Sequence, residues 1–259
     1  MLGLGNSLTN MLVPAAAGGG YTNAYSLEFD GTDDYVEFSN SLFQPAIRNS
    51  FTITMWLKIP ETSEQIWFSA YNGNANKFFV NLEGTSLNAY FSASWDDLLL
   101  QSTSVTVPTN EWFHFAITCL KTGTGSDPTV IEFFINGTKY TPSPLYSTAL
   151  TAANQGTFNL GSNHFRIGYD PARTANKMLD GTLLHELSLH EAVLSDLSIA
   201  ALADAPIDQT EDSGNYSASA LIGYWKLDEG TGTTATDSSA SGVDGNLATP
   251  PAWSTDVPG

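Results

Sequence analysis

The sequence predicts an all-β protein, an antiparallel β-sandwich with one short helix. Apolar and polar residues alternate in many short segments, which is typical of half-buried strands. Gly, Asn, Asp and Ser separate these segments at short intervals and supply turns. A chain of 259 residues with 42% hydrophobic content can bury a sizeable core, and sandwiches of this length are commonly one domain.

The amino-terminal half shows the alternation most clearly. Residues 26–38 predict a strand, a tight Asp-Gly turn and a second strand. The next strand ends at Pro60, and its apolar residues share one face: Phe51, Ile53, Met55, Leu57 and Ile59. Three further strands are expected at residues 65–71, 77–82 and 87–93.

The middle of the chain continues this pattern. Residues 112–120 and 130–135 predict strands, and Asn136-Gly137 predicts a hairpin turn into a short strand at 138–140. Residues 141–163 are rich in Pro, Ser, Thr and Gly and predict a long surface loop. A short strand is expected from Phe165 to Gly168.

The segment from Asp180 to Leu202 predicts a turn, a strand and the short helix. A two-residue period over residues 183–190 places Leu183, His185, Leu187 and Leu189 on one face. Ser195 is a suitable N-cap for a helix near Ser195–Ala203. The apolar residues of that helix, which include Leu197 and Ile199, can close over a sheet edge.

Three motifs resemble laminin-G-like jelly rolls of the concanavalin A-like lectin/glucanase superfamily. The segment that begins Asp180-Gly181 and contains Glu186 resembles the ending DG-x-[IL]-D-E-[VL] of those domains. Residues 112–118 resemble W-x-H-[VF]-A-[IV]-T, and residues 131–137 resemble [IV]-x-[FL]-[FY]-[IV]-[ND]-G. The resemblance covers about Tyr25 to Leu247 and implies a jelly roll that binds ligands rather than transforming them.

The carboxy-terminal portion resembles the usual beginning of these domains. Residues 221–230 carry that likeness, together with Asp237 and Asp244-Gly245. About 39 residues cannot build a second sandwich, because domains need roughly 50 or more. We expect a permuted jelly roll whose strand at 221–230 pairs beside Leu27–Phe29, or a trailing strand pair, within one domain spanning residues 21–259.

Charge and composition exclude several classes of partner. Nine Lys and Arg stand against 27 Asp and Glu, so the net charge of -18 repels nucleic acid and anionic membrane surfaces. The single cysteine, Cys119, cannot form a disulfide within the chain and lies in an apolar run. No run of apolar residues is long enough for a spanning helix. Residues 1–20 are uncharged, lack a secretory pattern and predict a flexible arm.

Two patterns of catalytic residues are weak, and we expect no enzyme. Glycoside hydrolases of the superfamily carry a Glu-x-Asp-x-x-Glu strand, but residues 28–33 end in Asp33, and Gly31 interrupts the strand. His185 and His190 superficially resemble a zinc-protease pair. They are five residues apart in a strand pattern, which predicts that they point to opposite sides of the sheet.

Calcium is the cofactor that the acidic turns favour. Asp-Gly turns offer the carboxylate and carbonyl oxygens that hard cations prefer. Laminin-G-like relatives often hold calcium at a sandwich rim, and the resemblance extends this role to four residues: Asp30, Asp180, Asp228 and Asp237. The alternative is that these carboxylates are solvated turn residues.

A carbohydrate site requires exposed aromatic rings beside polar groups, because a sugar stacks its C–H face on a ring. Five aromatic residues could line one concave face of the sandwich: Trp56, Trp67, Tyr71, Tyr90 and Trp95. The alternative is that they belong to the core between the sheets.

The amino-terminal stretch Met1–Leu8, followed by small residues, resembles virion proteins of marine tailed phages. This implies a capsid decoration or fibre protein located on the virion. Its arm would bind other virion proteins in a homo-oligomer or larger assembly, and its sandwich would face host glycans. The alternative is a free extracellular lectin or glycoside hydrolase.

Overall fold

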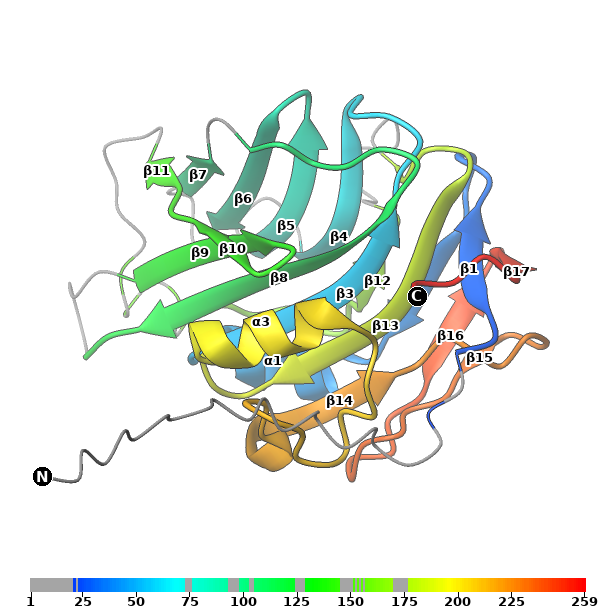
Figure 1. The fold of residues 1–259 in the computed structure, drawn as a ribbon. Coiled ribbons are helices and arrows are strands. Elements are labelled where there is room, and N and C mark those ends of the chain that lie inside the picture. The colour runs from blue at the N-terminus through cyan, green and yellow to red at the C-terminus, as the bar shows by residue number, and fades with distance from the viewer. Residues whose placement is uncertain are drawn as a thin grey trace, which may run out of the picture.

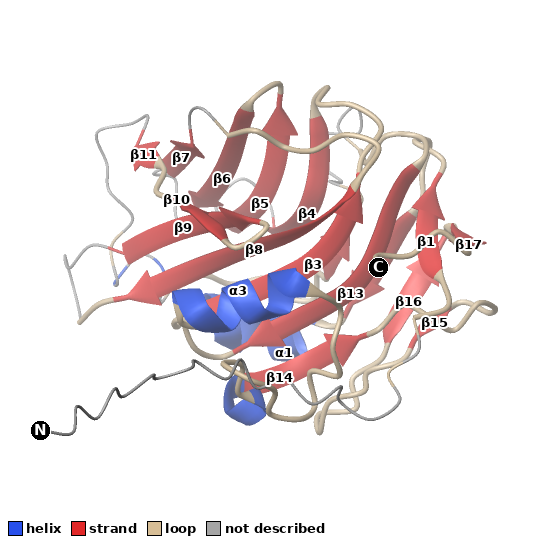
Figure 2. Cartoon of the chain, viewed as in Figure 1, coloured by secondary structure: helices blue, strands red, loops and turns tan. Residues whose placement is uncertain are grey.

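The computed structural model describes residues 21, 23–72, 76–92, 98–102, 105–123, 129–144, 151, 153, 155, 157–169 and 177–259. Two antiparallel sheets face each other and form a sandwich, as Figures 1 and 2 show. The predicted jelly-roll-type β-sandwich is confirmed. No helix among these residues has the length and apolar character to cross a membrane.

Sheet A has the strand order β10-β9-β8-β3-β13-β1-β17, and β14 also pairs with β13. Its strands are β1 (Ser26–Phe29), β3 (Phe51–Lys58), β8 (Trp112–Lys121), β9 (Thr129–Ile135), β10 (Thr138–Tyr140), β13 (Thr182–His190), β14 (Leu221–Trp225) and β17 (Ala252–Ser254). The hairpin predicted at Asn136-Gly137 connects β9 to β10, and both of its turn residues have positive φ.

Sheet B has the strand order β11-β7-β6-β5-β4-β12-β2-β16-β15. Its strands are β2 (Tyr35–Phe38), β4 (Gln65–Asn72), β5 (Asn76–Glu83), β6 (Ser86–Ser92), β7 (Leu98–Ser102), β11 (Ser143–Pro144), β12 (Phe165–Ile167), β15 (Thr234–Ala235) and β16 (Gly245–Ala248).

Aromatic side chains fill much of the core between the sheets. The Trp225 ring lies 4.5 Å from that of Phe38, and Trp67 lies 4.8 Å from Phe115, centroid to centroid. Such rings bury roughly 150–250 Å² each, so they account for much of the apolar area removed from water. Cys119 is fully buried in this core, as its apolar run indicates.

Helix α1 (Asn40–Ile47) does not follow from the sequence patterns considered above. Ser39 caps it by accepting a hydrogen bond from Ser41 N, and Pro45 lies inside it. Proline removes a helical hydrogen bond, which weakens the sequence signal for a helix. Burial of Phe43, whose ring stacks 3.8 Å from that of Phe165, holds the helix in the core.

Helix α3 (Asp196–Asp204) confirms the predicted helix and its N-cap, since Ser195 Oγ accepts a hydrogen bond from Ser198 N at 3.1 Å. It lies on the outer face of sheet A, where Ile199 and Leu202 pack near Ala116 and Phe134 (Figure 1). Leu197, which was expected to contribute to this packing, is 65% exposed instead.

A β-bulge in β13 changes which residues share a face. The register with β3 shifts between His185 and Leu187, and Glu186 has a φ of 47°. Its N–H donates to Lys226 O at 3.0 Å rather than to a strand partner within the ladder. At a bulge, two residues of one strand lie opposite a single residue of its partner. The alternation of side chains between the two faces of β13 is therefore interrupted at this point.

The bulge overturns two expectations. Leu184, Leu187 and Leu189 join the core, whereas Leu183 and His185 do not, so the predicted face is wrong. His185 pairs with Trp56 and His190 with Thr52, and these two β3 residues alternate with core residues. The two histidines therefore lie on the same outer face of sheet A, not on opposite faces.

The carboxy-terminal residues contribute to both sheets. β14 pairs with β13 over Leu187–His190, whereas β1 pairs with the same edge over Thr182–Leu184. The expected pairing of residues 221–230 beside Leu27–Phe29 is therefore wrong, because the two strands follow one another along β13. β17 is the strand that pairs with β1, and β16 pairs with β2.

Candidate functional site

An acidic pocket lies where β1 turns into β2. It has a volume of about 400 Å³, and its polar lining includes Glu28, Asp30, Asp34 and Asp180. Gly31 makes this arrangement possible, because its φ is +69° and a Cβ there would come 2.6 Å from Asp180 N. Two residues of the predicted calcium set, Asp30 and Asp180, thus line the same pocket.

Three carboxylates of the β1–β2 turn are close together. Asp30, Asp33 and Asp34 each offer an oxygen, and these oxygens lie within 4.8 Å of one another. Burial raises the pKa of Asp34, and the neighbouring charges of Asp30 and Asp33 raise it further, although a backbone hydrogen bond from Asp30 opposes this. A divalent cation would relieve this repulsion, and an all-oxygen donor set suits calcium.

The other two predicted ligands lie elsewhere in the structure. Asp237 accepts hydrogen bonds from Tyr224 N (3.0 Å), Ser239 N (2.8 Å), Val243 N (2.9 Å) and Ser241 Oγ (2.5 Å). Burial opposes its ionisation, but these hydrogen bonds hold the pKa of Asp237 below its usual value. Asp228 interacts electrostatically with Lys226 and Tyr21. Neither residue lines the acidic pocket.

The predicted aromatic residues occupy different environments. Trp67 is fully buried between the sheets, so it is removed from the candidate sugar-binding set. Trp56 lies on the outer face of sheet A, 94% buried beside His114. Tyr71 and Tyr90 belong to sheet B, on the side away from the core. Trp95 lies outside the described residues.

The outer face of sheet B carries a second candidate site, here called the Tyr35 patch: Tyr35, Glu37, His164, Arg166 and Tyr169. The rings of Tyr35 and Tyr169 stack 5.4 Å apart, and both residues are half-buried. The Arg166 guanidinium lies 5.3 Å from the Tyr35 ring centroid. It pairs with Glu37 at 2.7 Å, and His164 Nδ1 lies 3.1 Å from the same carboxylate.

The Tyr35 patch was absent from the sequence-based candidates. Residues of the predicted strand at 35–38 alternate, so Tyr35 and Glu37 could have been assigned to a polar face. Their partners lie more than 120 residues away in the chain. Only the pairing of β2 with β12, in which Glu37 is opposite Arg166, brings them together.

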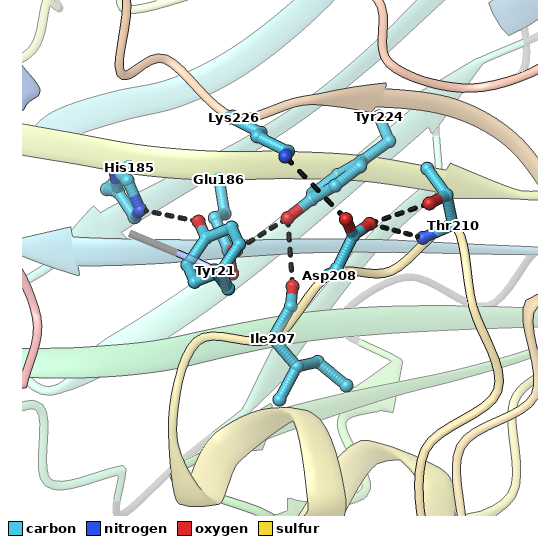
Figure 3. Close-up of polar contacts among 8 residues, drawn as sticks. All are labelled: Tyr21, His185, Glu186, Ile207, Asp208, Thr210, Tyr224 and Lys226. Carbon is cyan, nitrogen blue, oxygen red and sulfur yellow. Dashed lines mark hydrogen bonds and ion pairs between the residues drawn. The ribbon is translucent and has the colours of Figure 1, made fainter. Parts of the chain in front are cut away.

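The β13 bulge creates a third polar cluster, which Figure 3 shows. Glu186 is 99% buried, and its Oε1 accepts a hydrogen bond from Tyr224 Oη at 2.6 Å. Burial raises the pKa of Glu186 to about 7, although hydrogen bonds from Tyr21, Tyr224 and Gln209 and the charge of Lys226 oppose this. Burial also lowers the pKa of His185 to about 4, so this imidazole is neutral at physiological pH.

The two histidines of this cluster have separate partners. His185 forms hydrogen bonds with Tyr21 Oη through Nε2 and with Tyr25 O through Nδ1. His190 Nε2 forms a hydrogen bond with Tyr216 Oη at 3.1 Å. These contacts engage the histidines in structural networks rather than in a shared metal site.

Residues 28–33, which were compared with the Glu-x-Asp-x-x-Glu strand of glycoside hydrolases, do not form one continuous strand. β1 ends at Phe29, before Asp30 and Gly31.

These features define a lectin-like jelly roll with polar and aromatic surfaces. A family model described as "Concanavalin A-like lectin/glucanases superfamily" matches residues 30–200, more than half of the chain. The chain therefore belongs to this superfamily. No curated protein sequence matches it.

Solved structures share the fold at low sequence identity. A putative carbohydrate binding protein from Bacteroides ovatus ATCC 8483 is 16% identical with a TM-score of 0.59, covering 92% of this chain and 62% of that one. This chain thus spans less than two thirds of that protein. A heptameric SAP-like pentraxin from Limulus polyphemus is 14% identical with a TM-score of 0.46, covering 70% of this chain and 82% of that one. The similarity to the first structure shows the fold alone.

Replacing Asp237 tests its structural role. Asp237→Ala should lower the free energy of unfolding by about 2–4 kcal/mol, because several donors lose a charged acceptor. Asp204→Ala is the control and should cost less than about 1 kcal/mol, since the Asp204 side chain is exposed at the end of α3. The folded pKa of Asp237 is depressed, so its contribution exists above pH 3.8 and disappears as the pH falls further. Urea unfolding at pH 7 and pH 3 measures this difference, and equal costs at both pH values would contradict the assignment.

Proposed function

We propose that the chain is a non-catalytic carbohydrate-binding domain whose sugar site is the Tyr35 patch. The observation that carries the proposal is the half-buried pair of stacked tyrosine rings beside three charged or titratable side chains. Membership of a superfamily that includes lectins supports the proposal, as does the similar fold of the putative carbohydrate binding protein from Bacteroides ovatus.

The chemistry of the patch suits a sugar. Aromatic rings can stack against the C–H face of a pyranose, and Arg166 and Glu37 supply directional donors and acceptors for hydroxyl groups. The ion pair between these two side chains holds them in fixed positions beside the Tyr35 ring. Tyr71 lies on the same outer face and could extend the contact.

Glycan binding tests this site directly. A glycan array should identify a ligand, and Tyr169→Ala should weaken its binding at least about tenfold, because loss of an aromatic stacking contact costs roughly 0.5–1.5 kcal/mol beyond its buried area. Tyr140→Ala on β10 of the other sheet is the matched control and should bind normally. Binding that survives Tyr169→Ala unchanged, or a sugar that is cleaved during incubation, would contradict the proposal.

We further propose that the acidic pocket binds one calcium ion. Asp30, Asp33 and Asp34 offer clustered carboxylates, and Asp180 reaches the same pocket from the segment before β13. Bound calcium would connect the β1–β2 turn to the start of β13. The ion is expected to stabilise the rim rather than to take part in any reaction.

Calcium should raise the unfolding temperature, because a ligand that binds the folded state stabilises it in proportion to RT ln(1 + [L]/Kd). Isothermal titration should show one site, and Asp30→Asn combined with Asp34→Asn should remove both the heat and the stabilisation. Asp212→Asn, on an exposed loop away from the pocket, is the control. No difference in unfolding temperature between calcium and chelator would exclude the site.

A second candidate function is display on a virion, as a decoration or fibre protein in a larger assembly. Residues 1–20 carry no charge, and their sequence resemblance to virion proteins of tailed phages supports this role. The virion is the proposed location, and an extracellular lectin is the alternative. Deleting residues 1–20 should prevent incorporation into particles while leaving sugar binding intact. Normal incorporation of the deletion variant would rule this role out.

A further inference from the structure

We propose that the outer face of sheet A carries a second binding site, for an acidic sugar, and that residues 255–258 form a strap whose Asp256 occupies it. The Asp256 carboxylate uses both of its oxygens there. Oδ2 lies 2.5 Å from Lys58 Nζ, and Oδ1 accepts a hydrogen bond from Trp112 Nε1 at 2.7 Å. A ligand carboxylate can replace that of Asp256 on the same two donors. The site lies on the opposite sheet from the Tyr35 patch and does not rest on that assignment.

Strand pairing groups four side chains of this site into one block. Lys58 and Trp112 are opposite each other in the ladder between β3 and β8. Trp56 and His114 form the next pair on the same outer face, since the residues between the two pairs point into the core. Neighbours two residues apart on one face of a strand are separated by roughly 7 Å. One ligand can therefore contact all four side chains.

Trp56 and His114 carry polar atoms that the protein leaves without partners. The two side chains are only 6% and 1% exposed, and their rings lie 5.3 Å apart. Trp56 Nε1 and both ring nitrogens of His114 have no hydrogen-bond partner within the part of the chain that the structure describes. Buried polar atoms without partners are costly, so a ligand that supplies complementary groups gains free energy by pairing with them.

The unpartnered atoms favour a hydroxylated ligand. Burial lowers the pKa of His114 to about 3, so its imidazole is neutral and offers one donor and one acceptor. A hydroxyl group both donates and accepts, which matches this ring and the indole N–H of Trp56. The indole rings also offer apolar faces to the C–H groups of a sugar. A uronic acid joins these hydroxyls to a carboxylate, whereas an acidic peptide supplies the carboxylate alone.

The strap has few attachments, so a ligand can compete with it. The Lys58 and Asp256 side chains are 26% and 43% exposed, and ion pairs exposed to this extent contribute little to stability. Ser26 Oγ donates to Asp256 O, and Asn23 Nδ2 donates to Pro258 O, both at 2.6 Å. The preceding strand, β17, pairs with β1 over only three residues. Figure 1 shows the chain end over this face of sheet A.

Removing the Asp256 carboxylate tests the site. The probes are trisaccharides of galacturonate and of glucuronate, with the neutral trisaccharides of galactose and glucose for comparison. Asp256→Ala should bind one of the uronates at least about tenfold more tightly than the parent protein, because no internal carboxylate competes for the charged donor. The matching neutral sugar should bind at least about tenfold more weakly than the uronate. Isothermal titration in 0.15 M salt, where charges are screened beyond about 8 Å, limits the influence of the net charge of -18.

Three further variants serve as comparisons. Lys58→Met in the Asp256→Ala background keeps the aliphatic stem but loses the ammonium, and it should abolish the preference for uronate over neutral sugar. Asp256→Asn keeps an acceptor for Trp112 without the charge, and it should give a smaller gain than Asp256→Ala. Thr255→Ala changes an exposed residue of the same strap and should bind like the parent protein. Circular dichroism checks that each variant keeps the sandwich.

Four results would overturn the proposal. The first is uronate binding that is no tighter in Asp256→Ala and Asp256→Asn than in the parent protein. The second is equal binding of uronate and neutral sugar, and the third is a uronate preference that survives Lys58→Met. The fourth is tighter binding of a blocked Thr-Asp-Val-Pro peptide than of either uronate to Asp256→Ala, since this would identify a peptide ligand instead of a sugar.

Discussion

The structure depends on one irregularity, the β-bulge at Glu186 in the central strand of sheet A. At the bulge, the Glu186 N–H donates to Lys226 O. On the same edge of β13, β1 pairs before the bulge and β14 pairs after it. The bulge also keeps three leucines in the core while both histidines face outward. A residue with positive φ is costly in a strand, and the surrounding hydrogen bonds and packing compensate for that cost.

The two outer faces of the sandwich differ in chemistry because different segments cover them. On sheet A, α3 packs over β8. In the carboxy-terminal tail, Asp256 forms an ion pair with Lys58 at 2.5 Å and accepts a hydrogen bond from Trp112 Nε1 at 2.7 Å. Figure 1 shows the chain end in front of β13. On sheet B, Tyr35 and Tyr169 remain half-buried with charged neighbours. The outer face of sheet A therefore carries a buried polar network, whereas that of sheet B carries half-buried aromatic and charged side chains.

Aspartates in similar turns have two distinct roles. Asp237 is surrounded by N–H and O–H donors, which satisfy its charge and organise the loop that follows β15. Asp30, Asp33 and Asp34 have carboxylate oxygens within 4.8 Å of one another, and Asp30 and Asp34 accept one backbone hydrogen bond each, from Thr32 N and Asp30 N. The same residue type thus fixes a turn in one place and creates a negative pocket in another, and the number of nearby donors decides which.

The alternation of side chains, the Asn-Gly hairpin and the Ser195 N-cap determined the sandwich, most of its strands and α3, because each depends on neighbours in the chain. The resemblance to one family named Asp30 and Asp180 among four candidate calcium ligands, and only the tertiary structure brought these two to one pocket. Tertiary structure decided the burial of Trp67, the bulge at Glu186 and the meeting of Glu37 with Arg166. Each of these depends on pairing between strands that are far apart in the sequence. A local pattern of residues does not determine which face of a strand is buried or which distant strand pairs with it.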